Sequence, residues 1–539
     1  NSSAFESTLK LQNLTSSADL RLGLVLTFST KAVADGEEMK HLQYIRGMCR
    51  TCALTAVDAE YLARVKLAAA GFKDHTTLAT KLSLLVQSAS VVLGHCARVR
   101  SLGARTLLTV IEVASRSRLE RMASNESAME DSDDAINESE ILMHAARSVF
   151  IPRLSKPDVR VFTSVLEDVF GFIVSTEVSS HGKWQLMESI TLQMRKFKMD
   201  KQNTWMEKIL QLQDLTHQNH GVMVLGGATS GKSAIIAILQ RALQSSARQD
   251  TVPETYTLEK LNPKSLTVLQ MYGWWSSDPE QWVDGAFSHL CRWRRPPGIS
   301  TWIVLDGPID PLWAENLNTV LDQHKMLTLA NGDRIPMKPT TRVIFESDTC
   351  DNASPATMAR VGMLWVPVTA LPWRSYVNKW IEGRGSEERM ILRSLFDRYM
   401  DHLLHFVKMQ CSPVIQTPVN FIPCMLTSLF DCTAKYLEFR WDGNGEEFLE
   451  KVFIFCLAWA FGGLLENIDR MKLSQFMYTL TDLLPVMKND TTLFDFYPND
   501  NMLDWDQKAF NEQAANDWHK HAGMRSSTVV RPPDILRSG

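Results

Sequence analysis

The sequence predicts an α/β protein in which a parallel sheet with flanking helices carries a phosphate-binding loop, with helical segments on both sides. Three observations predict this class. Short apolar runs at 222–225 and 302–305 are followed by Gly or Asp, as buried parallel strands commonly are. The segment 234–243 between them has helical periodicity, and so do most of 139–213 and 371–487. Strands separated by helices favour a parallel sheet.

The N-terminal part is predicted to be mostly helical. An apolar run at 22–28 (LGLVLTF) predicts one buried strand, and helical periodicity follows at 57–70, 76–93 and 102–116. The last 50 residues or so are polar and weakly periodic, which favours a connector or the beginning of another unit.

The central motif is a phosphate loop. Residues 226–233 (GGATSGKS) match GxxxxGK[ST], between the strand GVMVL and the helix AIIAILQRAL. Glycines allow the tight turn that aims successive backbone N–H groups at phosphate oxygens, and the helix N-terminus adds its dipole. We expect Lys232 to reach the β- and γ-phosphates of a nucleotide and Ser233 to bind Mg²⁺. The predicted nucleotide-binding residues are Gly226, Gly227, Ala228, Thr229, Ser230, Gly231, Lys232, Ser233 and Asp306.

The strand WIVLD places Asp306 beside this loop as the carboxylate associated with Mg²⁺. Ring-forming ATPases that hydrolyse ATP carry a glutamate at the next position, which polarises the attacking water, but here that position is Gly307. Asp310 is expected to cap a helix that begins at Pro311. The sequence therefore favours nucleotide binding with little or no turnover, and no catalytic residue is assigned.

Two further elements follow the Asp306 strand. Residues 326–337 (MLTLANGDRIPM) predict a hairpin around Asn331-Gly332, a dipeptide suited to a type I′ turn. Residues 342–345 (RVIF) predict another strand.

Composition excludes several classes of function. The 57 Lys and Arg against 61 Asp and Glu give a net charge of −4, so we expect no nucleic-acid partner. The longest uncharged apolar run, 452–465, is too short to span a bilayer, so we expect no membrane association. Cys49 and Cys52 form a CxxC pair without a second pair, and the remaining cysteines are scattered, which favours reduced thiols over a zinc site.

Long stretches of this sequence resemble a known family. LDGPIDPLWAENLNTVLDQHKMLTLANGDRIPM, then FESDTCDNASPATMARVGMLWV, closely resembles the second AAA+ module of a dynein heavy chain of the axonemal outer-arm type. VFIFCLAWAFGGLLENIDRMKLSQFMYTL resembles the helical lid of that module, and TLFDFYPNDNMLDW the stretch leading into the third. RVKLAAAGFKDHTTLATKL and SLGARTLLTVIEVAS are similar to the end of the first module.

The resemblance implies a division of the chain into five parts. Residues 1–75 would be the divergent end of the first AAA+ large subdomain, and 76–155 its helical lid. Residues 156–370 would be the second large subdomain with the phosphate loop, and 371–490 its lid. Residues 491–539 would connect to the third module.

The resemblance also assigns roles to four charged residues. Arg360 and Arg46 stand where a ring ATPase presents an arginine to a neighbour's γ-phosphate, and they are the arginine-finger candidates, although a structural ion pair is nearly as good an interpretation of Arg46. Arg105 matches the sensor-2 arginine of the first lid, and Glu346 stands at the sensor-1 position of the second module, where an amide is expected. The lid helix 451–465 has no arginine placed like Arg105.

The first module departs from the family pattern at its sensor-1 strand, where Ser29 and Thr30 replace Asn-Pro. Its own phosphate loop is not in these 539 residues. The alternatives are therefore a segment of a longer heavy chain and a truncated protein derived from dynein.

The preferred hypothesis is a ring segment of an axonemal dynein heavy chain whose second module binds ATP or ADP with Mg²⁺ structurally, in support of microtubule-based ciliary or flagellar motility. The resemblance implies as partners the other AAA+ modules, dynein intermediate and light chains, docking proteins and, through regions outside this segment, microtubules. It implies a place in the cytoplasm and cytoskeleton, at the axoneme of a cilium or flagellum. The alternative is a non-motor axonemal scaffold with a relic AAA+ fold, and slow ATP hydrolysis is a third interpretation.

Overall fold

The computed structural model describes residues 52, 58–93, 103–127, 137–171, 181–197, 203–246, 255–277, 280–293, 298–322, 324–415, 420–436, 446–486, 492–499 and 504–507. The chain divides into two compact units, 1–57 and 58–539. In the first unit the structure describes Cys52, which is exposed as a free thiol. The strand predicted at 22–28 and the residues Ser29, Thr30, Arg46 and Cys49 lie outside the described residues.

The second unit begins with a helical cluster. Its elements are α3 (Ala59–Ala69), α4 (His75–Val92), α5 (Ala104–Ser127), α6 (Glu138–Phe150), η1 (Ile151–Arg153) and α7 (Lys156–Phe170). The predicted helices at 57–70, 76–93 and 102–116 are confirmed as α3, α4 and α5, and α5 continues beyond its predicted end.

Helix α7 belongs to this cluster by its packing. Phe162, Leu166 and Phe170 are buried in the same apolar core as the residues of α3 to α6, and Phe162 stacks on Phe150. The core of this cluster therefore continues to Phe170, past position 155/156, and the division expected there stays a prediction.

The centre of the second unit is a five-stranded parallel sheet, which confirms the predicted α/β class. Its strands lie in the order β2 (Thr255–Leu261), β5 (Ile299–Asp306), β8 (Thr341–Ser347), β1 (Gly221–Leu225) and β9 (Gly362–Trp365). Every pair of neighbouring strands is parallel, so all five carboxyl ends lie at one edge. A ligand of such a sheet binds in the crevice outside that edge.

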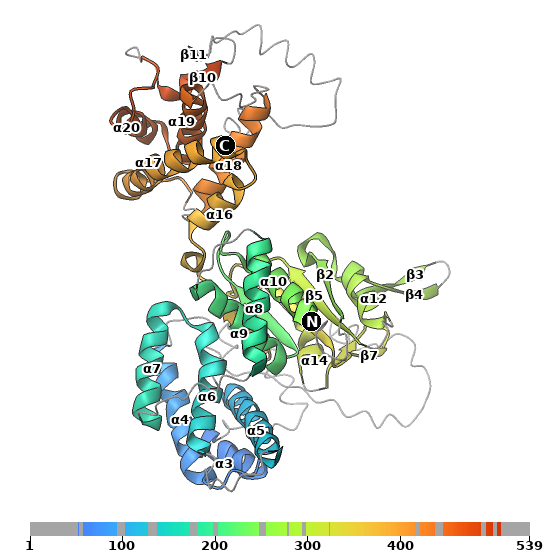
Figure 1. Ribbon diagram of the computed structural model, residues 1–539. Helices are drawn as coiled ribbons and strands as arrows, with labels where there is room; N and C mark the ends of the chain where they lie inside the picture. Colours follow the sequence, from blue (N-terminus) through green and yellow to red (C-terminus); the bar gives the residue numbers. More distant parts are fainter. Residues whose placement is uncertain are drawn as a thin grey trace. The chain divides into compact units, whose positions relative to one another are not determined.

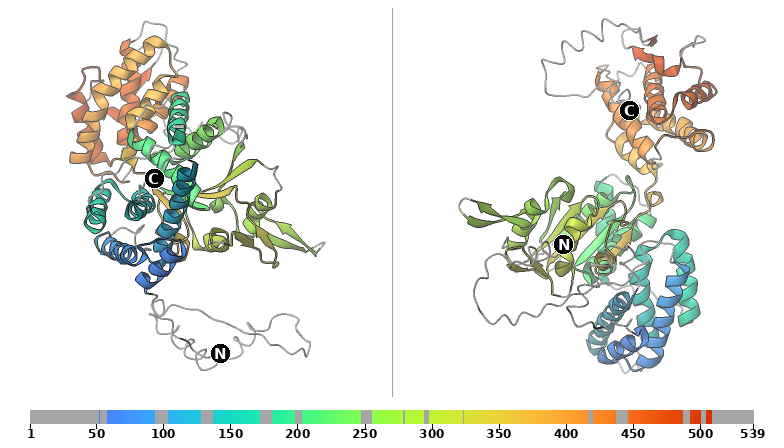
Figure 2. Two further views of the ribbon diagram at one scale, coloured as in Figure 1. Left: turned by 60° about the horizontal axis from the view of Figure 1, so that its bottom comes forward. Right: turned by 180° about the vertical axis from the view of Figure 1, so that it is seen from behind.

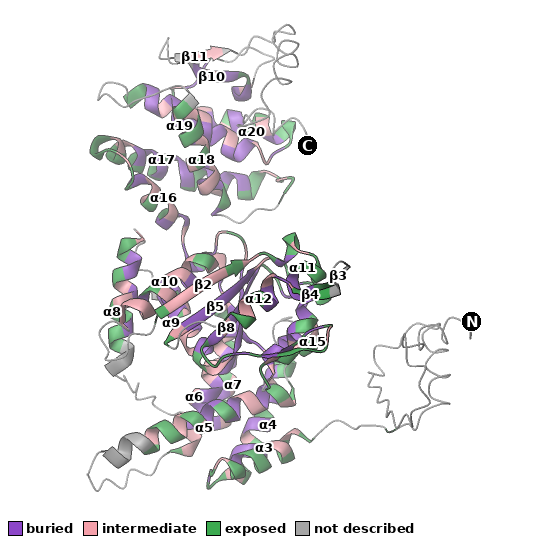
Figure 3. Cartoon of the chain, turned by 90° about the vertical axis from the view of Figure 1, so that its right-hand side faces the viewer, coloured by how far each residue is buried: buried purple, intermediate pink, exposed green. Residues whose placement is uncertain are grey.

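Alternate residues of each strand face opposite layers of helices, as the two-residue repeat of a strand requires. Val222 and Val224 pack against α8 (His181–Lys196), α9 (Asn203–Gln218) and α10 (Lys232–Ser246), while Met223 and Leu225 belong to the core on the other face. Figure 3 shows β5 and β8 buried in the middle of this sandwich. Burial on both faces explains the continuous apolar runs in the sequence.

The second face is covered by short elements. They are η2 (Pro263–Ser265), α11 (Val268–Tyr272), α12 (Ala286–Arg292), α13 (Pro311–Ala314), η3 (Glu315–Leu317), α14 (Asn318–Leu321) and α15 (Pro355–Met358). The short η4 (Val368–Ala370) packs instead in the core of the first face, through Ala370. The predicted cap is confirmed, because the Asp310 side chain accepts a hydrogen bond from the Leu312 N–H at 2.9 Å. A hairpin of β3 (Gly273–Ser277) and β4 (Glu280–Asp284) projects beyond α12 (Figure 1).

The hairpin predicted at 326–337 is confirmed as β6 (Met326–Thr328) and β7 (Arg334–Pro336), but its turn type was predicted wrongly. A type I′ turn needs positive φ at both central residues. Gly332 has φ +87°, whereas Asn331 is not among the residues with positive φ. The Gly332 N–H donates to the Leu329 carbonyl, and the Leu329 N–H to the Asp333 carbonyl. These two bonds describe a three-residue loop with glycine at its left-handed position.

The chain then forms a second helical cluster, orange to red in Figure 2. Its elements are α16 (Trp373–Ile381), α17 (Ser386–Gln410), α18 (Phe421–Tyr436), α19 (Glu446–Gly462), α20 (Asn467–Tyr478), η5 (Leu493–Asp495), β10 (Phe496–Asn499) and β11 (Asp504–Gln507). Leu493 and Phe494, from the segment expected to be a connector, are buried in this cluster. Within the described ranges, no helix combines the length and apolar character needed to cross a bilayer.

Candidate nucleotide-binding site

The phosphate loop has the backbone shape that anion binding requires. It joins the fully buried strand β1 to the N-terminus of α10, at the carboxyl end of the sheet. Gly231 has φ +85° and Thr229 has φ +67°. Positive φ is uncommon for a β-branched residue such as threonine, and strained backbone of this kind concentrates at ligand sites. Backbone that alternates between right- and left-handed conformations forms a concave nest of N–H groups suited to phosphate.

Gly226 is required at the start of the loop by a close backbone approach. A Cβ atom there would lie 2.2 Å from the carbonyl oxygen of Val366 and 2.9 Å from Oγ of Ser230. The Val366 N–H in turn donates to the Leu225 carbonyl at 2.8 Å, so the chain after β9 is bonded to the end of β1. No side chain fits at 226 without moving the backbone that carries the loop.

Two aromatic residues border the far side of the loop. The hydroxyl of Tyr376 on α16 donates to the carbonyl of Thr229 at 2.8 Å. Burial, and to a lesser degree the nearby Cys424, raises the pKa of Tyr376 to about 12, so the hydroxyl keeps its proton at neutral pH. Trp205 on α9 is fully buried, and its Nε1 would lie 3.1 Å from a Cβ atom at Gly231.

Three buried polar atoms at the loop have no hydrogen-bond partner among the described residues: Thr229 Oγ1, Ser230 Oγ and Trp205 Nε1. Buried polar atoms are almost always paired in folded proteins, by protein, water or a ligand. Unpaired hydroxyl and indole N–H groups beside a nest of backbone N–H groups match the acceptor oxygens of a phosphate chain. The residues present therefore fit a nucleotide.

Lys232 lies within the loop and is held by oxygens of the chain itself. Its ammonium donates to the carbonyls of Gly226 and Gly227 and to Oδ1 of Asp348, at 2.7 Å from the carboxylate. The Lys232 side chain is 10% exposed and that of Asp348 is 66% exposed. Asp348 thus occupies the ammonium that we expect to bind phosphate oxygens.

Ser233, Asp306 and Glu346 come together at the end of the sheet. Asp306 and Glu346 are direct neighbours in the register of β5 and β8. The Ser233 hydroxyl donates to Oε1 of Glu346, which is 4% exposed. Lys260, on the edge strand β2, reaches both carboxylates, with its Nζ 3.0 Å from Asp306 Oδ2 and 3.5 Å from Glu346 Oε2. Of the two expected Mg²⁺ ligands, Asp306 is therefore paired with an ammonium group and Ser233 with the Glu346 carboxylate.

The position after Asp306 offers no group to orient a water molecule. The Gly307 N–H donates to the Glu346 carbonyl at 3.0 Å, which holds the chain in line with β8. A Cβ atom at Gly307 would lie 3.1 Å from Oδ1 of Asn262, so a longer side chain there needs a small adjustment of that amide.

The arginines expected to serve other sites converge on Asp322, at the end of α14. Nη1 of Arg105 and Nε of Arg360 each lie 2.9 Å from Oδ1 of Asp322. The Arg105 contact is a hydrogen bond, whereas Arg360 Nε makes no hydrogen bond, and that contact is electrostatic. Arg360 donates instead through Nη1 to the Ala356 carbonyl at 2.6 Å. The two arginines therefore meet at one carboxylate, which lies 217 positions after Arg105 in the sequence.

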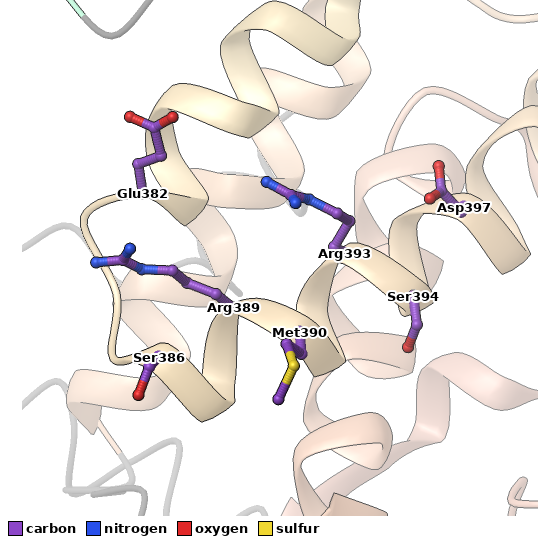
Figure 4. Close-up of a pocket in the computed structure, with 7 residues that line it drawn as sticks. All are labelled: Glu382, Ser386, Arg389, Met390, Arg393, Ser394 and Asp397. Carbon is purple, nitrogen blue, oxygen red and sulfur yellow. The ribbon is translucent and has the colours of Figure 1, made fainter.

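A hollow of about 820 Å³ lies on the second helical cluster and includes none of the phosphate-loop residues. Figure 4 shows its lining along α17, with Arg389 and Arg393 beside Glu382 and Asp397. It is open to solvent, and four of its seven lining residues are charged. A ligand site usually encloses an apolar surface with a few converging polar groups, so the loop is the better candidate.

Sequence reasoning missed two residues of the site, Lys260 and Asp348. Both reach the loop from segments distant in the sequence, on β2 and after β8. Lys260 lies in no recognisable motif, and the Asn-Pro-Lys that follows Leu261 is not typical of a catalytic site. Asp348 had a detectable signal, since it follows the sheet strand next to β1 and is charged at the carboxyl edge.

Three protein families match this chain. Residues 23–233 match "Hydrolytic ATP binding site of dynein motor region", and residues 221–361 match "AAA domain (dynein-related subfamily)". Residues 392–507 match "Dynein heavy chain AAA lid domain". The second match contains the phosphate loop and β5, and the third contains most of the second helical cluster.

Three similar proteins, described below, are much longer than this chain. The chain is 31% identical over 495 residues, 91% of its length, to the dynein gamma chain of the flagellar outer arm from Chlamydomonas reinhardtii, of which the match covers 10%. It is 32% identical over 466 residues, 85% of its length, to dynein axonemal heavy chain 8 from Mus musculus, of which 9% is covered. The ciliary dynein beta chain from Tripneustes gratilla is 29% identical over 476 residues, 86% of this chain and 10% of that protein. The chain thus spans about a tenth of the length of these relatives.

Proposed function

Because this chain belongs to the dynein heavy chain family, we propose that its central sheet is a nucleotide-binding AAA+ module of a motor ring that holds ATP or ADP without useful hydrolysis. The observation that carries the proposal is the loop between β1 and α10. Its left-handed Thr229 and Gly231, its lysine and its unpaired buried hydroxyls all suit a phosphate chain.

The assignment of the module is part of the proposal. Residues 23–233 resemble the hydrolytic unit of the family, and their match ends at Ser233, where the central loop also ends. We assign the first helical cluster to the lid of a first module, the sheet to a second module and the C-terminal cluster to the second lid. Arg360 would then face the nucleotide of the first module, and its proximity to Arg105 supports a shared site for the two guanidinium groups.

The weak hydrolysis follows from Gly307 and Glu346. A glutamate at 307 would orient the attacking water, and loss of one such group costs about two to four orders of magnitude in rate. Glu346 brings a carboxylate to the place where an amide would contact the γ-phosphate, and like charges repel there. Neither residue offers what hydrolysis needs.

We infer the role of the whole protein from its membership of the dynein heavy chain family. A module that binds nucleotide without cleaving it would support the ring and transmit changes from its hydrolysing neighbours during ciliary or flagellar movement. The partners would be the other AAA+ modules, intermediate and light chains and docking proteins, with microtubules reached through other regions. The site of action would be the axoneme.

A titration of the full chain with a fluorescent ATP analogue and with the matching ADP analogue tests the proposal. Wild-type protein should bind, and Lys232→Ala should lose binding because the main positive charge of the loop is gone. Lys208→Ala is the control, since it removes a lysine of α9 that bonds to Gln211. Equal affinity in wild type and Lys232→Ala would contradict the assignment of the loop.

A further inference from the structure

Lys260 lies where the two carboxylates of the site face each other. The order β2–β5–β8 places its strand next to the strand of Asp306, and Glu346 is on the strand beyond. In register, Lys260 pairs with Val304, two residues before Asp306, so its long side chain extends along the sheet toward the carboxyl edge. One ammonium group thereby contacts the charged ends of two neighbouring strands.

The Lys260 ammonium offsets the repulsion between the Asp306 and Glu346 carboxylates. Two carboxylates in adjacent register repel each other, and the Glu346 side chain is 5% exposed, so water screens its charge poorly. Oε1 of Glu346 is bonded to Ser233, while Oε2 makes no hydrogen bond among the described residues and lies 3.5 Å from Lys260 Nζ. Burial alone lowers the pKa of Lys260, but the hydrogen bond to Asp306 and the charge of Glu346 raise it, and the net shift is upward.

Two of the groups at this site, Ser233 and Asp306, would be the protein ligands of Mg²⁺. Mg²⁺ is commonly held by one or two carboxylates, a hydroxyl and the phosphates themselves. Here the hydroxyl of Ser233 donates to Glu346, and Asp306 is paired with an ammonium at 3.0 Å. Both groups that would bind the metal are therefore already engaged by other side chains, and this arrangement suits a magnesium ion poorly.

We propose that the ammonium of Lys260 supplies, at this site, the positive charge that a divalent cation would otherwise supply, so that the loop binds nucleoside di- or triphosphates with little dependence on Mg²⁺. This inference rests on the proposed nucleotide binding. Lys260 is a specificity-determining residue in this account, because its charge lets a metal-free phosphate chain bind about as well as the magnesium complex.

The experiment measures the affinity of the full chain for a fluorescent ADP analogue in excess Mg²⁺ and in excess EDTA. In wild type the two affinities should agree within about threefold, which is less than 1 kcal/mol. Lys260→Ala should bind at least about tenfold more weakly in EDTA and should regain affinity when Mg²⁺ is added. Lys260→Arg keeps the charge and should behave as wild type. Lys264→Ala, which removes an exposed lysine four residues further on, is the matched control.

The outcomes separate the two proposals. Loss of wild-type binding in EDTA, with binding in Mg²⁺ intact, overturns the role of Lys260 and leaves nucleotide binding standing. Absence of wild-type binding under both conditions overturns nucleotide binding itself. Thermal unfolding without nucleotide identifies any variant that fails to fold. If Lys260→Ala fails, the affinities of wild type and Lys260→Arg for the ADP analogue in EDTA decide whether the positive charge is what matters.

Discussion

Lys232 Nζ lies 2.7 Å from Oδ1 of Asp348, a residue 116 positions further along the chain. The lysine of the phosphate loop is thus paired with a carboxylate of the chain itself. A phosphate chain entering the loop has to compete with Asp348 for the same ammonium. Much of the behaviour of the site follows from this competition.

The first prediction concerns Asp348→Asn. Removing the carboxylate frees Lys232, and nucleotide affinity should rise by about three- to fivefold, because an ion pair whose carboxylate is exposed to solvent contributes up to about 1 kcal/mol. Equilibrium titration with a fluorescent nucleotide measures the change. Asp351→Asn, at an exposed position in the same loop, should leave the affinity unchanged. Weaker binding by Asp348→Asn would show that this carboxylate supports the ligand instead of competing with it.

The second prediction concerns Gly226→Ala. The added methyl group meets the Val366 carbonyl at 2.2 Å, so the loop or the end of β9 has to move. We expect a loss of about 1–3 kcal/mol in the free energy of unfolding and loss of nucleotide binding. Chemical denaturation and titration measure the two effects. Gly385→Ala is the control, because a Cβ atom there has nothing within 4 Å. An unchanged stability for Gly226→Ala would contradict the described loop geometry.

The central strands and the loop could be predicted from sequence because their signals are local. The strand before Gly226, the helix after Lys232 and the apolar run before Asp306 each occupy a short continuous stretch. Long-range partners carry no such signal. Lys260 reaches the site through the register of β2, β5 and β8, and Asp348 through the pairing of β8 with β1; both registers are properties of the assembled sheet.

Local chemistry also misled in one place. Asn331-Gly332 is a common type I′ pair, yet the loop places positive φ at Gly332 and not at Asn331. The side-chain oxygen of Asn331 accepts a hydrogen bond from the Asp333 N–H at 3.0 Å, and the side-chain nitrogen of Asn331 donates to Asp333 Oδ2. Arg292 also pairs with Asp333. These contacts favour the three-residue loop. The contact from Arg292, which is distant in the sequence, could not be predicted from the Asn-Gly dipeptide.

The third prediction concerns pH and His220, just before β1. The pKa of His220 is lowered to about 4, mainly by burial and to a lesser degree by the positive charges of Arg342 and Lys325. Unfolded histidine titrates near its ordinary value of 6.5. Between these two values the unfolded chain binds a proton that the folded chain does not. Stability from this group is therefore complete above about pH 6.5 and falls toward pH 4, by at most about 1.4 kcal/mol per pH unit.

Denaturant unfolding of wild type and His220→Leu from pH 7 to pH 4 measures this contribution. The difference between the two proteins isolates His220 from other histidines with a lowered pKa, such as His217, where partial desolvation is the main cause. The variant should lose less stability on acidification than wild type does. His402→Leu, on the exposed side of α17, is the control. Parallel pH profiles for wild type and His220→Leu would count against a neutral buried ring.

The fourth prediction concerns Gly307→Glu. The substitution restores the residue type that orients water, and its Cβ atom requires a small adjustment of the Asn262 amide. We expect the rate of phosphate release to rise by less than about tenfold, because Glu346 still brings negative charge beside the γ-phosphate. Steady-state phosphate release with saturating ATP measures the rate. An increase of about a hundredfold or more would show that Gly307 alone limits hydrolysis.

The most direct test of the central claim follows the fate of bound ATP. The full chain is incubated with labelled ATP, and both the nucleotide retained by the protein and the phosphate released are measured over time, with Lys232→Ala beside it. The account predicts retained ATP or ADP, lost in Lys232→Ala, with phosphate release close to that of the buffer. Sustained phosphate release by wild type that Lys232→Ala abolishes would contradict it and would establish a working ATPase.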